Sequence, residues 1–339
     1  MSGIGTGAAI FGCAGPRLLS EERAFFRAFD PFGFILFARN VETPDQLRRL
    51  TGDLREAVGR EAPVLVDQEG GRVQRMRAPY WREWQPPLET VAAAPDLETA
   101  ARSMRLRMRL IAAELRAAGI DANCAPVADV ARDTTHPFLK NRCYGTDPAV
   151  VSVIARAVAD GLQDGGVWPV VKHMPGHGLS RMDTHHDLPT VTATAAELDR
   201  IDFAPFRALA DLPMAMTAHI IYAAHDSLPA TQSPAMIRLI REDIGFGGLL
   251  MTDDLNMEAL KGTLSSRTSA SLAAGCDIAL HCKGDFAQMQ EVAAAAGDMR
   301  ADTRARAAAA LAARRDPLPL DIAEAEAELA ALTAAAAHV

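Results

Sequence analysis

Two segments of this sequence combine residues that can do chemistry with glycines that bend the backbone. The first is DQEGGRVQR, from Asp67 to Arg75, and the second is KHMPGHG, which begins with Lys172 and His173. Asp67 could simply cap a turn, and Arg75 could be a surface ion-pair partner. The second segment is harder to explain structurally, because it places a lysine and two histidines on an irregular loop directly after an apolar run. We therefore expect Lys172 and His173 to donate hydrogen bonds to hydroxyl or carbonyl groups of a substrate.

Two further segments offer a proton donor and a nucleophile. Asp183 precedes His185 by two residues, and Asp253 directly precedes Asp254. A neighbouring carboxylate raises the pKa of an imidazole and makes it a usable proton donor near neutrality, although such a loop could also be merely solvated. One aspartate of the second pair is expected to cap a helix and the other to act as a nucleophile. The spacing does not say which.

The reaction class can be narrowed by what these segments lack. The histidines at 177, 185 and 186 could form a metal site with Asp183, but no known ligand spacing matches, and we expect no metal or other cofactor. No G-x-S-x-G segment is present, which disfavours acyl transfer. A carboxylate and a proton donor are the pair that glycoside hydrolysis needs.

Short apolar runs precede these segments and predict the fold. Each run is continuously apolar, as strands covered on both faces are, and helical stretches separate the runs. The predicted strands span 8–14, 33–37, 63–67, 120–127, 167–172, 214–218, 248–252 and 276–282. Eight strand–helix repeats predict a closed (β/α)8 TIM barrel, with a doubly wound open sheet as the alternative. In such a barrel the polar segments would converge on the rim formed by the carboxyl ends of the strands.

Length and composition limit the domain organisation, the partners and the location that we expect. We expect one barrel domain over residues 1–339, with the last barrel helix starting near Thr303 and an appended helix at about 318–339. A net charge of −8 argues against nucleic-acid binding. The five cysteines are expected to be buried, reduced thiols. Because neither a secretory signal nor a membrane span is visible, we expect a cytoplasmic protein, and we expect a monomer.

Together the four segments resemble glycoside hydrolase family 3. DQEGGRVQR, KHMPGHG, the D-T-H from Asp183 and TDDLNM from Thr252 occur in the family's order and on the expected strands. The resemblance runs from about residue 8 to 282 and is greatest to short, single-domain bacterial β-N-acetylglucosaminidases of cell-wall recycling. Met174 stands where phenylalanine is common, and His186 offers a second imidazole directly after His185.

The resemblance implies a retaining exo-β-N-acetylglucosaminidase (β-N-acetylhexosaminidase). Asp253 would be the nucleophile that forms a glycosyl–aspartate intermediate, and His185, paired with Asp183, would be the general acid/base. The substrate would be a muropeptide with N-acetylglucosamine β-1,4-linked to anhydro-N-acetylmuramic acid. The residues expected to bind the aminosugar are Asp67, Arg75, Arg142, Lys172 and His173.

Several alternatives stay open at this point. The barrel could be a metal-dependent hydrolase that uses His177, His185 and His186, or a sugar-binding barrel without catalytic activity. Glucoside-specific and phosphorolytic members of the family exist, and activity on N-acetylgalactosaminides is also open. We further expect the polar loop between residues 178 and 188 to close over the bound sugar.

Overall fold

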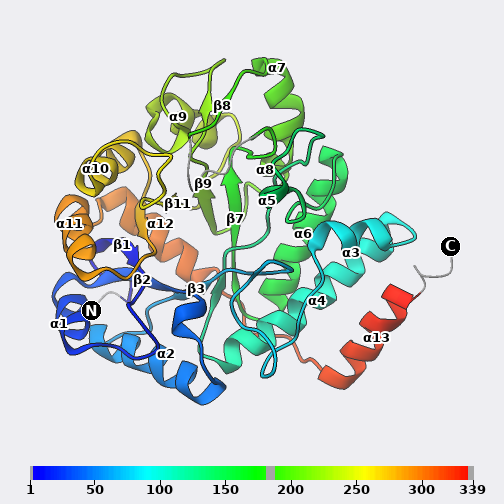
Figure 1. Ribbon diagram of the computed structural model, residues 1–339, viewed down its shortest axis with the longest axis horizontal. Coiled ribbons are helices and arrows are strands. Elements are labelled where there is room, and N and C mark those ends of the chain that lie inside the picture. Colours follow the sequence, from blue (N-terminus) through cyan, green and yellow to red (C-terminus); the bar gives the residue numbers. More distant parts are fainter. Residues whose placement is uncertain (1–2, 181–187, 335–339) are drawn as a thin grey trace.

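In the computed structural model, which describes residues 3–180 and 188–334, eight parallel strands close into the predicted barrel (Figure 1). The order around the barrel is β1-β12-β11-β9-β7-β6-β3-β2. The strands are β1 (Gly7–Phe11), β2 (Pro31–Leu36), β3 (Val64–Val66), β6 (Ala122–Asn123), β7 (Trp168–Met174), β9 (Met214–Thr217), β11 (Leu249–Asp254) and β12 (Ile278–His281). The first and last strands pair directly, with Ala9 opposite Ala279, so the open-sheet alternative is wrong.

All eight predicted strands are present, with different bounds. The fourth is much shorter than predicted, since β6 has only two residues of the expected 120–127. Pro126 has no N–H to donate to a neighbouring strand, and only an isolated bridge, from Val127 to Lys172, follows β6. Beyond β3 lies an unpredicted hairpin of β4 (Gln68–Gly70) and β5 (Val73–Gln74). A second small sheet pairs β8 (Thr190–Val191) with β10 (Ile221–Tyr222).

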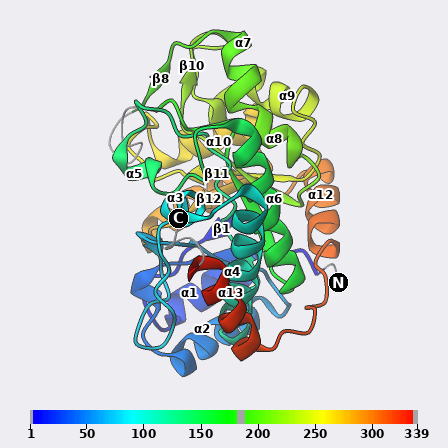
Figure 2. The same ribbon diagram turned by 90° about the vertical axis from the view of Figure 1, so that its right-hand side faces the viewer.

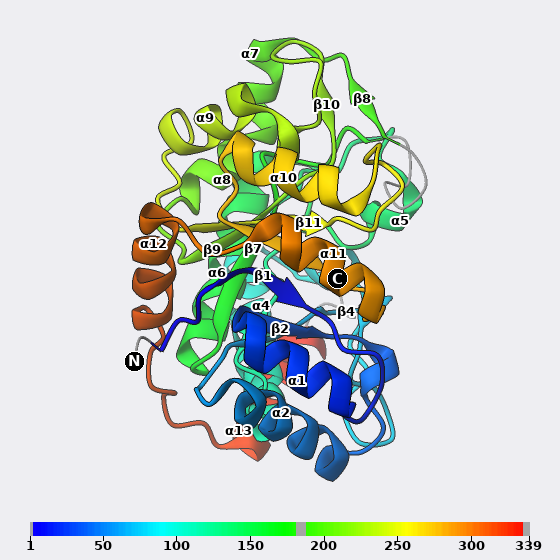
Figure 3. The same ribbon diagram turned by 90° about the vertical axis from the view of Figure 1, so that its left-hand side faces the viewer.

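Helices surround the barrel in chain order. The longer ones are α1 (Ser20–Phe29), α2 (Pro44–Val58), α4 (Leu97–Ala117), α6 (Pro148–Asp164), α9 (Pro234–Glu242), α10 (Leu264–Ala274) and α11 (Phe286–Ala296). Shorter ones are η1 (Ala38–Asn40), α3 (Pro87–Ala93), α5 (Pro137–Lys140), α7 (Ala195–Glu197), η2 (Leu198–Asp202), α8 (Ala204–Ala208) and η3 (Ala230–Gln232). Capping residues set several starts: Thr43 and Ser233 each accept a backbone N–H before a proline-led helix. The circle of helices closes where α11 meets α1 (Figures 1 and 3). There the centroids of the Phe25 and Phe286 side-chain rings are 5.8 Å apart.

The amino-terminal end of the barrel is covered by α12 (Ala301–Ala312), seen beside β9 in Figure 3. Ala307 and Ala310 of this helix are buried in the same cluster as the inward-facing Ile10 and Leu65 of the strands. The expectation that the last barrel helix starts near Thr303 is therefore wrong. That place is taken by α11, and the alanine-rich segment has side chains small enough to pack under the barrel.

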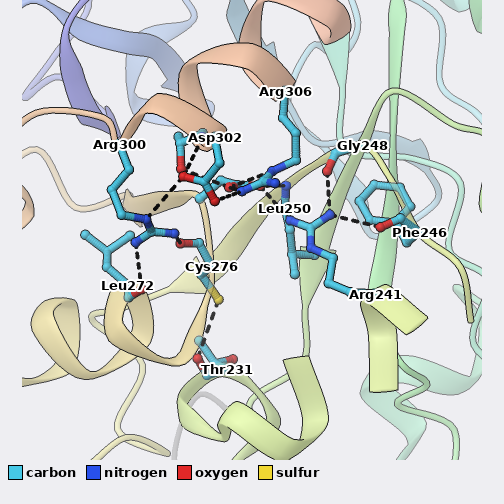
Figure 4. Close-up of polar contacts among 12 residues, drawn as sticks. Thr231, Arg241, Phe246, Gly248, Leu250, Leu272, Cys276, Arg300, Asp302 and Arg306 are labelled. Atoms are coloured by element: carbon cyan, nitrogen blue, oxygen red, sulfur yellow. Dashed lines mark hydrogen bonds and ion pairs between the residues drawn. The ribbon is translucent and has the colours of Figure 1, made fainter. Parts of the chain in front are cut away.

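A buried carboxylate ties α12 to the barrel (Figure 4). Asp277, which precedes β12, accepts hydrogen bonds from Arg241 of α9 (2.7 Å), Arg306 of α12 (2.7 Å) and Thr303 (3.0 Å). Its Oδ2 also accepts the backbone N–H of Leu250 in β11 at 2.9 Å. One carboxylate thus joins two helices and two strands at the end of the barrel opposite to the predicted site.

The chain continues into α13 (Ile322–Ala334), which lies against α4 outside the ring (Figure 2). Ala325 packs on Leu106 and Leu110 of α4, with Leu320 and Leu329 at the edge of this cluster. None of the described helices is both long enough and apolar enough to span a membrane.

Candidate active site

A cavity of about 570 Å³ opens at the carboxyl ends of the barrel strands. It contains polar residues from both predicted segments, including Asp67, Arg75, Lys172 and His173, together with Arg142 and Asp253. Its apolar wall is formed by Ile35, Phe37, Met216, Met257, Leu280 and Cys282. A volume of this size is within the range of small-ligand sites. The five predicted sugar-binding residues and the predicted nucleophile therefore line one cavity.

Alternating charges connect five side chains at one side of the cavity. The ammonium of Lys172 lies 2.7 Å from Oδ1 of Asp67 and 2.6 Å from Oε1 of Glu69. Glu69 also accepts two hydrogen bonds from Arg142, from Nε at 2.9 Å and from Nη2 at 2.8 Å. Arg75 donates to the other oxygen of Asp67 at 2.9 Å. Each cation is fixed by a carboxylate, so the network presents a defined set of donors and acceptors to a ligand.

The carboxylates of this network are ionised despite their burial. Burial alone would raise the pKa of Asp67, but Lys172 and Arg75 lower that pKa well below its usual range. In the same way, Arg142 and Lys172 outweigh burial and lower the pKa of Glu69. Burial would lower the pKa of Lys172, but the two carboxylates raise it, so the ammonium stays charged.

The hairpin β4–β5 holds Asp67 and Glu69 in place. Its buried Gln68 accepts the backbone N–H of Arg75 (2.9 Å), and the backbone N–H of Gln68 donates to Asn123 in β6 (2.9 Å). Behind the hairpin, Arg107 of α4 donates to the carbonyl of Glu69 at 3.1 Å. Gly70 leaves the room for this guanidinium: a Cβ there would lie 1.7 Å from Nη2 of Arg107. The glycine also has φ +100°, which other residues rarely adopt.

Asp129 anchors the end of β7, where Lys172 and His173 lie, and the loop that follows this strand. Its Oδ2 lies 2.7 Å from Nδ1 of His173, and its Oδ1 accepts the backbone N–H of His177 at 2.7 Å. Burial would raise the pKa of Asp129, but His173 lowers it, so the carboxylate is ionised. An ionised acceptor at Nδ1 fixes the tautomer of His173 with its proton there and leaves Nε2 for other contacts.

The two aspartates at the end of β11 differ in their surroundings. For Asp253, the electrostatic interactions with His173 and His219, together with the hydrogen bond from the backbone N–H of Asp254 (2.8 Å), outweigh burial and lower the pKa. For Asp254, burial raises the pKa to about 6, and its Oδ1 already accepts the backbone N–H groups of Asn256 and Cys282, both at 3.1 Å. Of these two aspartates, Asp253 is thus the ionised one available in the cavity, while Asp254 organises the loop after the strand.

Comparison with known proteins settles the family. Residues 22–311 match the glycosyl hydrolase family 3 N terminal domain. The chain belongs to glycosyl hydrolase family 3. It is therefore a glycoside hydrolase, and the barrel described above is the family 3 barrel.

Known proteins are similar to this chain over most of its length. A beta-hexosaminidase from Alkalilimnicola ehrlichii is 41% identical over 285 residues, 81% of this chain and 80% of that protein. A beta-hexosaminidase from Bordetella avium is 39% identical over 277 residues, 79% of this chain and 78% of that protein. The crystal structure of NagZ from Neisseria gonorrhoeae in complex with N-trifluoroacetyl-D-glucosamine is 30% identical. It superposes with a TM-score of 0.83 over 99% of this chain and 100% of that one.

Three residues of the family 3 site were missed by the sequence reasoning. Glu69 belongs to a recognised segment, but its role depends on Arg142, which lies 73 positions away. Asp129 lies two residues after the fourth predicted strand and could have been found from that position. Arg107 lies inside a long helix, where nothing in the local pattern distinguishes it from a surface residue. Asp183 and His185 lie outside the described residues.

Proposed function

We propose that this family 3 protein is a retaining exo-β-N-acetylglucosaminidase that acts on peptidoglycan fragments. The observation that carries the proposal is the ionised Asp253, which lines the same cavity as the Asp67–Lys172–Glu69–Arg142 network. A carboxylate nucleophile beside a rigid set of polar groups is what a glycosidase needs at the anomeric carbon. The names of the relatives support the substrate class, because they are beta-hexosaminidases and one binds an N-acylated glucosamine.

In this mechanism Asp253 attacks the anomeric carbon and forms a glycosyl–aspartate ester. Its low pKa supports this role, because the carboxylate is ionised at neutral pH. Water then attacks the same carbon from the side of the departed group, so the product keeps the β configuration. Asp254 contributes by fixing the backbone that carries Asp253, and His219 donates from Nε2 to the Asp254 carbonyl at 3.1 Å.

The proton for the leaving oxygen comes from His185, with Asp183 as its partner. This role rests on the family resemblance of the D-T-H segment. On cleavage the imidazolium protonates the departing oxygen, and in the second step the neutral imidazole takes a proton from the attacking water.

The aminosugar is held by Asp67, Arg75, Arg142, Lys172 and His173. Asp67 keeps lone pairs for sugar hydroxyls while it fixes Lys172, and Nε2 of His173 is available for a hydroxyl or the acetamido group. The natural substrate that we propose is N-acetylglucosamine β-1,4-linked to anhydro-N-acetylmuramic acid in a muropeptide. We also propose that the enzyme works as a cytoplasmic monomer and that the barrel with its appended helix is a single catalytic domain.

A panel of aryl β-glycosides tests the proposal. We expect cleavage of the N-acetylglucosaminide, weak cleavage of the glucoside, and no change in rate when phosphate is added. NMR of the first product should show the β-anomer, and initial release of the α-anomer would overturn the two-step mechanism. Full activity after exhaustive chelation would discard the metal-dependent alternative. Wild-type-like turnover by Asp253→Asn would discard the assigned nucleophile.

A further inference from the structure

Among the cations that line the cavity in the described part of the chain, one has no acidic partner. Lys172, Arg75 and Arg142 are each paired with a carboxylate, as described above. Arg72 lies in the turn between β4 and β5, lines the cavity and is exposed. Among the ion pairs of the described part of the chain, no carboxylate lies within 4.0 Å of its guanidinium. This charge is therefore available to a ligand.

The Arg72 side chain is nevertheless held in place. Its guanidinium lies over the ring of Phe138 in α5, with the Cζ atom 4.2 Å from the ring centroid. Arg142 approaches the same ring, at 5.4 Å from its centroid. Stacking on an aromatic face stabilises the guanidinium in one position and reduces the rotamer freedom that binding would have to remove.

A histidine beside this pair adds a hydrogen-bond donor. His136 also lines the cavity, and its Nδ1 accepts the backbone N–H of Phe138 at 3.2 Å. In the neutral ring the proton is therefore on Nε2, which can donate to an acceptor on a ligand. Arg72, His136 and Phe138 thus form a rim group with a positive charge, a neutral donor and an aromatic face.

The position of the rim group determines which part of a substrate it meets. An exo-acting glycosidase holds the terminal sugar against its nucleophile, so the leaving group must extend toward the mouth of the cavity. The deep residues are the buried Lys172 and Glu69, whereas Arg72 is exposed at the mouth. The rim group therefore lies where the leaving group passes.

We propose that Arg72, His136 and Phe138 form a binding site for the leaving group and select one that carries a carboxylate. This inference rests on the proposed function and extends it from the cleaved sugar to the group that departs. The guanidinium would pair with the carboxylate through two parallel hydrogen bonds, and Nε2 of His136 would donate to a neighbouring oxygen. Phe138 would keep the guanidinium in this position through the stacking described above.

Two matched substrates test the proposal: 4-carboxyphenyl and 4-carbamoylphenyl β-N-acetylglucosaminide, which differ in charge but hardly in shape. We expect wild-type kcat/KM to favour the carboxylate, and Arg72→Met to lower the ratio of the two values by about 3- to 10-fold at low salt, the range of an exposed to half-buried ion pair. Comparing ratios between variants cancels the difference in leaving-group acidity. Arg72→Lys, which keeps the charge, should retain part of the preference, and added salt should weaken the wild-type preference.

Arg77→Met is the matched control. Arg77 is also exposed and follows the same hairpin, but it pairs with Glu83 at 2.6 Å and does not line the cavity. Both methionine variants change the net charge equally, so a general field effect would lower both ratios alike and overturn the proposal. An Arg72→Met ratio equal to the wild-type ratio would also overturn it. Failure of the proposed function would look different, because wild-type enzyme would then cleave neither substrate.

Discussion

Glu69 accepts hydrogen bonds from the guanidinium of Arg142 with both carboxylate oxygens, although Glu69 does not itself line the cavity. The two bonds measure 2.9 and 2.8 Å, and the Glu69 side chain is only 1% exposed. Glu69 is thus a positioning residue: it fixes Arg142 on one side and Lys172 on the other, and these two meet the sugar.

Glu69→Gln should therefore impair substrate binding more than turnover. The amide cannot balance two buried cations, so Arg142 and Lys172 should lose their fixed geometry. We expect KM to rise about 10-fold or more and the free energy of unfolding to fall by about 3–5 kcal/mol. Steady-state kinetics and urea denaturation measure the two effects. Glu83→Gln removes an exposed ion pair with Arg77 and should change neither. An unchanged KM in Glu69→Gln would show that the network does not position the sugar-binding groups.

The two neighbouring aspartates should respond differently to the same substitution. Asp253→Asn should reduce kcat by at least ~10⁴-fold, because removal of a nucleophile leaves only binding and electrostatic contributions. Asp254→Asn keeps an oxygen that can accept the Asn256 and Cys282 N–H groups, so much of the activity should remain. Turnover of an aryl N-acetylglucosaminide by both variants measures this. If Asp254→Asn is the inactive one, the assignment of the nucleophile is wrong.

The free energy of unfolding should depend on the protonation of Asp254 between pH 4 and 6. Burial raises its pKa to about 6 from an ordinary 3.8. The folded protein therefore binds more protons than the unfolded chain in this window, and the contribution of Asp254 to stability falls as the pH rises. Asparagine does not titrate, so Asp254→Asn lacks this loss. The free energy of unfolding of the variant, relative to that of the wild type, should therefore be higher at pH 7 than at pH 4. Urea midpoints at both pH values give the comparison, and a constant difference between the two proteins would contradict the raised pKa.

His185 offers a test that depends on the leaving group. If its imidazole protonates the departing oxygen, His185→Ala should lose about 10²–10⁴-fold in kcat on a disaccharide substrate. The loss should be much smaller on a 4-nitrophenyl glycoside, whose leaving group needs little protonation. His186→Ala is the natural control and should retain activity on both. Equal losses of His185→Ala on the two substrates would remove it from the donor role.

Asp277 should matter for stability and not for catalysis. It is fully buried at the end of the barrel opposite to the cavity, and it pairs with Arg241 and Arg306, which are labelled in Figure 4. Removing its charge leaves two arginines without their common partner, so Asp277→Asn should lower the free energy of unfolding by about 3–5 kcal/mol. KM for an aryl N-acetylglucosaminide should stay at the wild-type value below the melting transition. A raised KM there would mean that this end of the barrel influences the site.

The sequence predicted the barrel well because its strands are continuous apolar runs and its helices begin with recognisable caps. Asp67, Lys172 and Asp253 could be placed on one rim because each follows such a run. Glu69 could not be assigned, since its role depends on Arg142 far along the chain, whereas Asp129 could have been found from its place just after the fourth predicted strand. The position of α12 was also unpredictable, because an alanine-rich helix fits against many surfaces.

Closure of the barrel by its two ends has a consequence for how the protein is made. Ala9 pairs with Ala279, and the interior is completed only by Ala307 and Ala310 of α12. A growing chain therefore exposes unpaired strand edges and an open apolar interior until the segment through α12 has left the ribosome. Such late, long-range contacts slow folding and leave nascent chains prone to aggregation, so chaperone dependence during synthesis is expected.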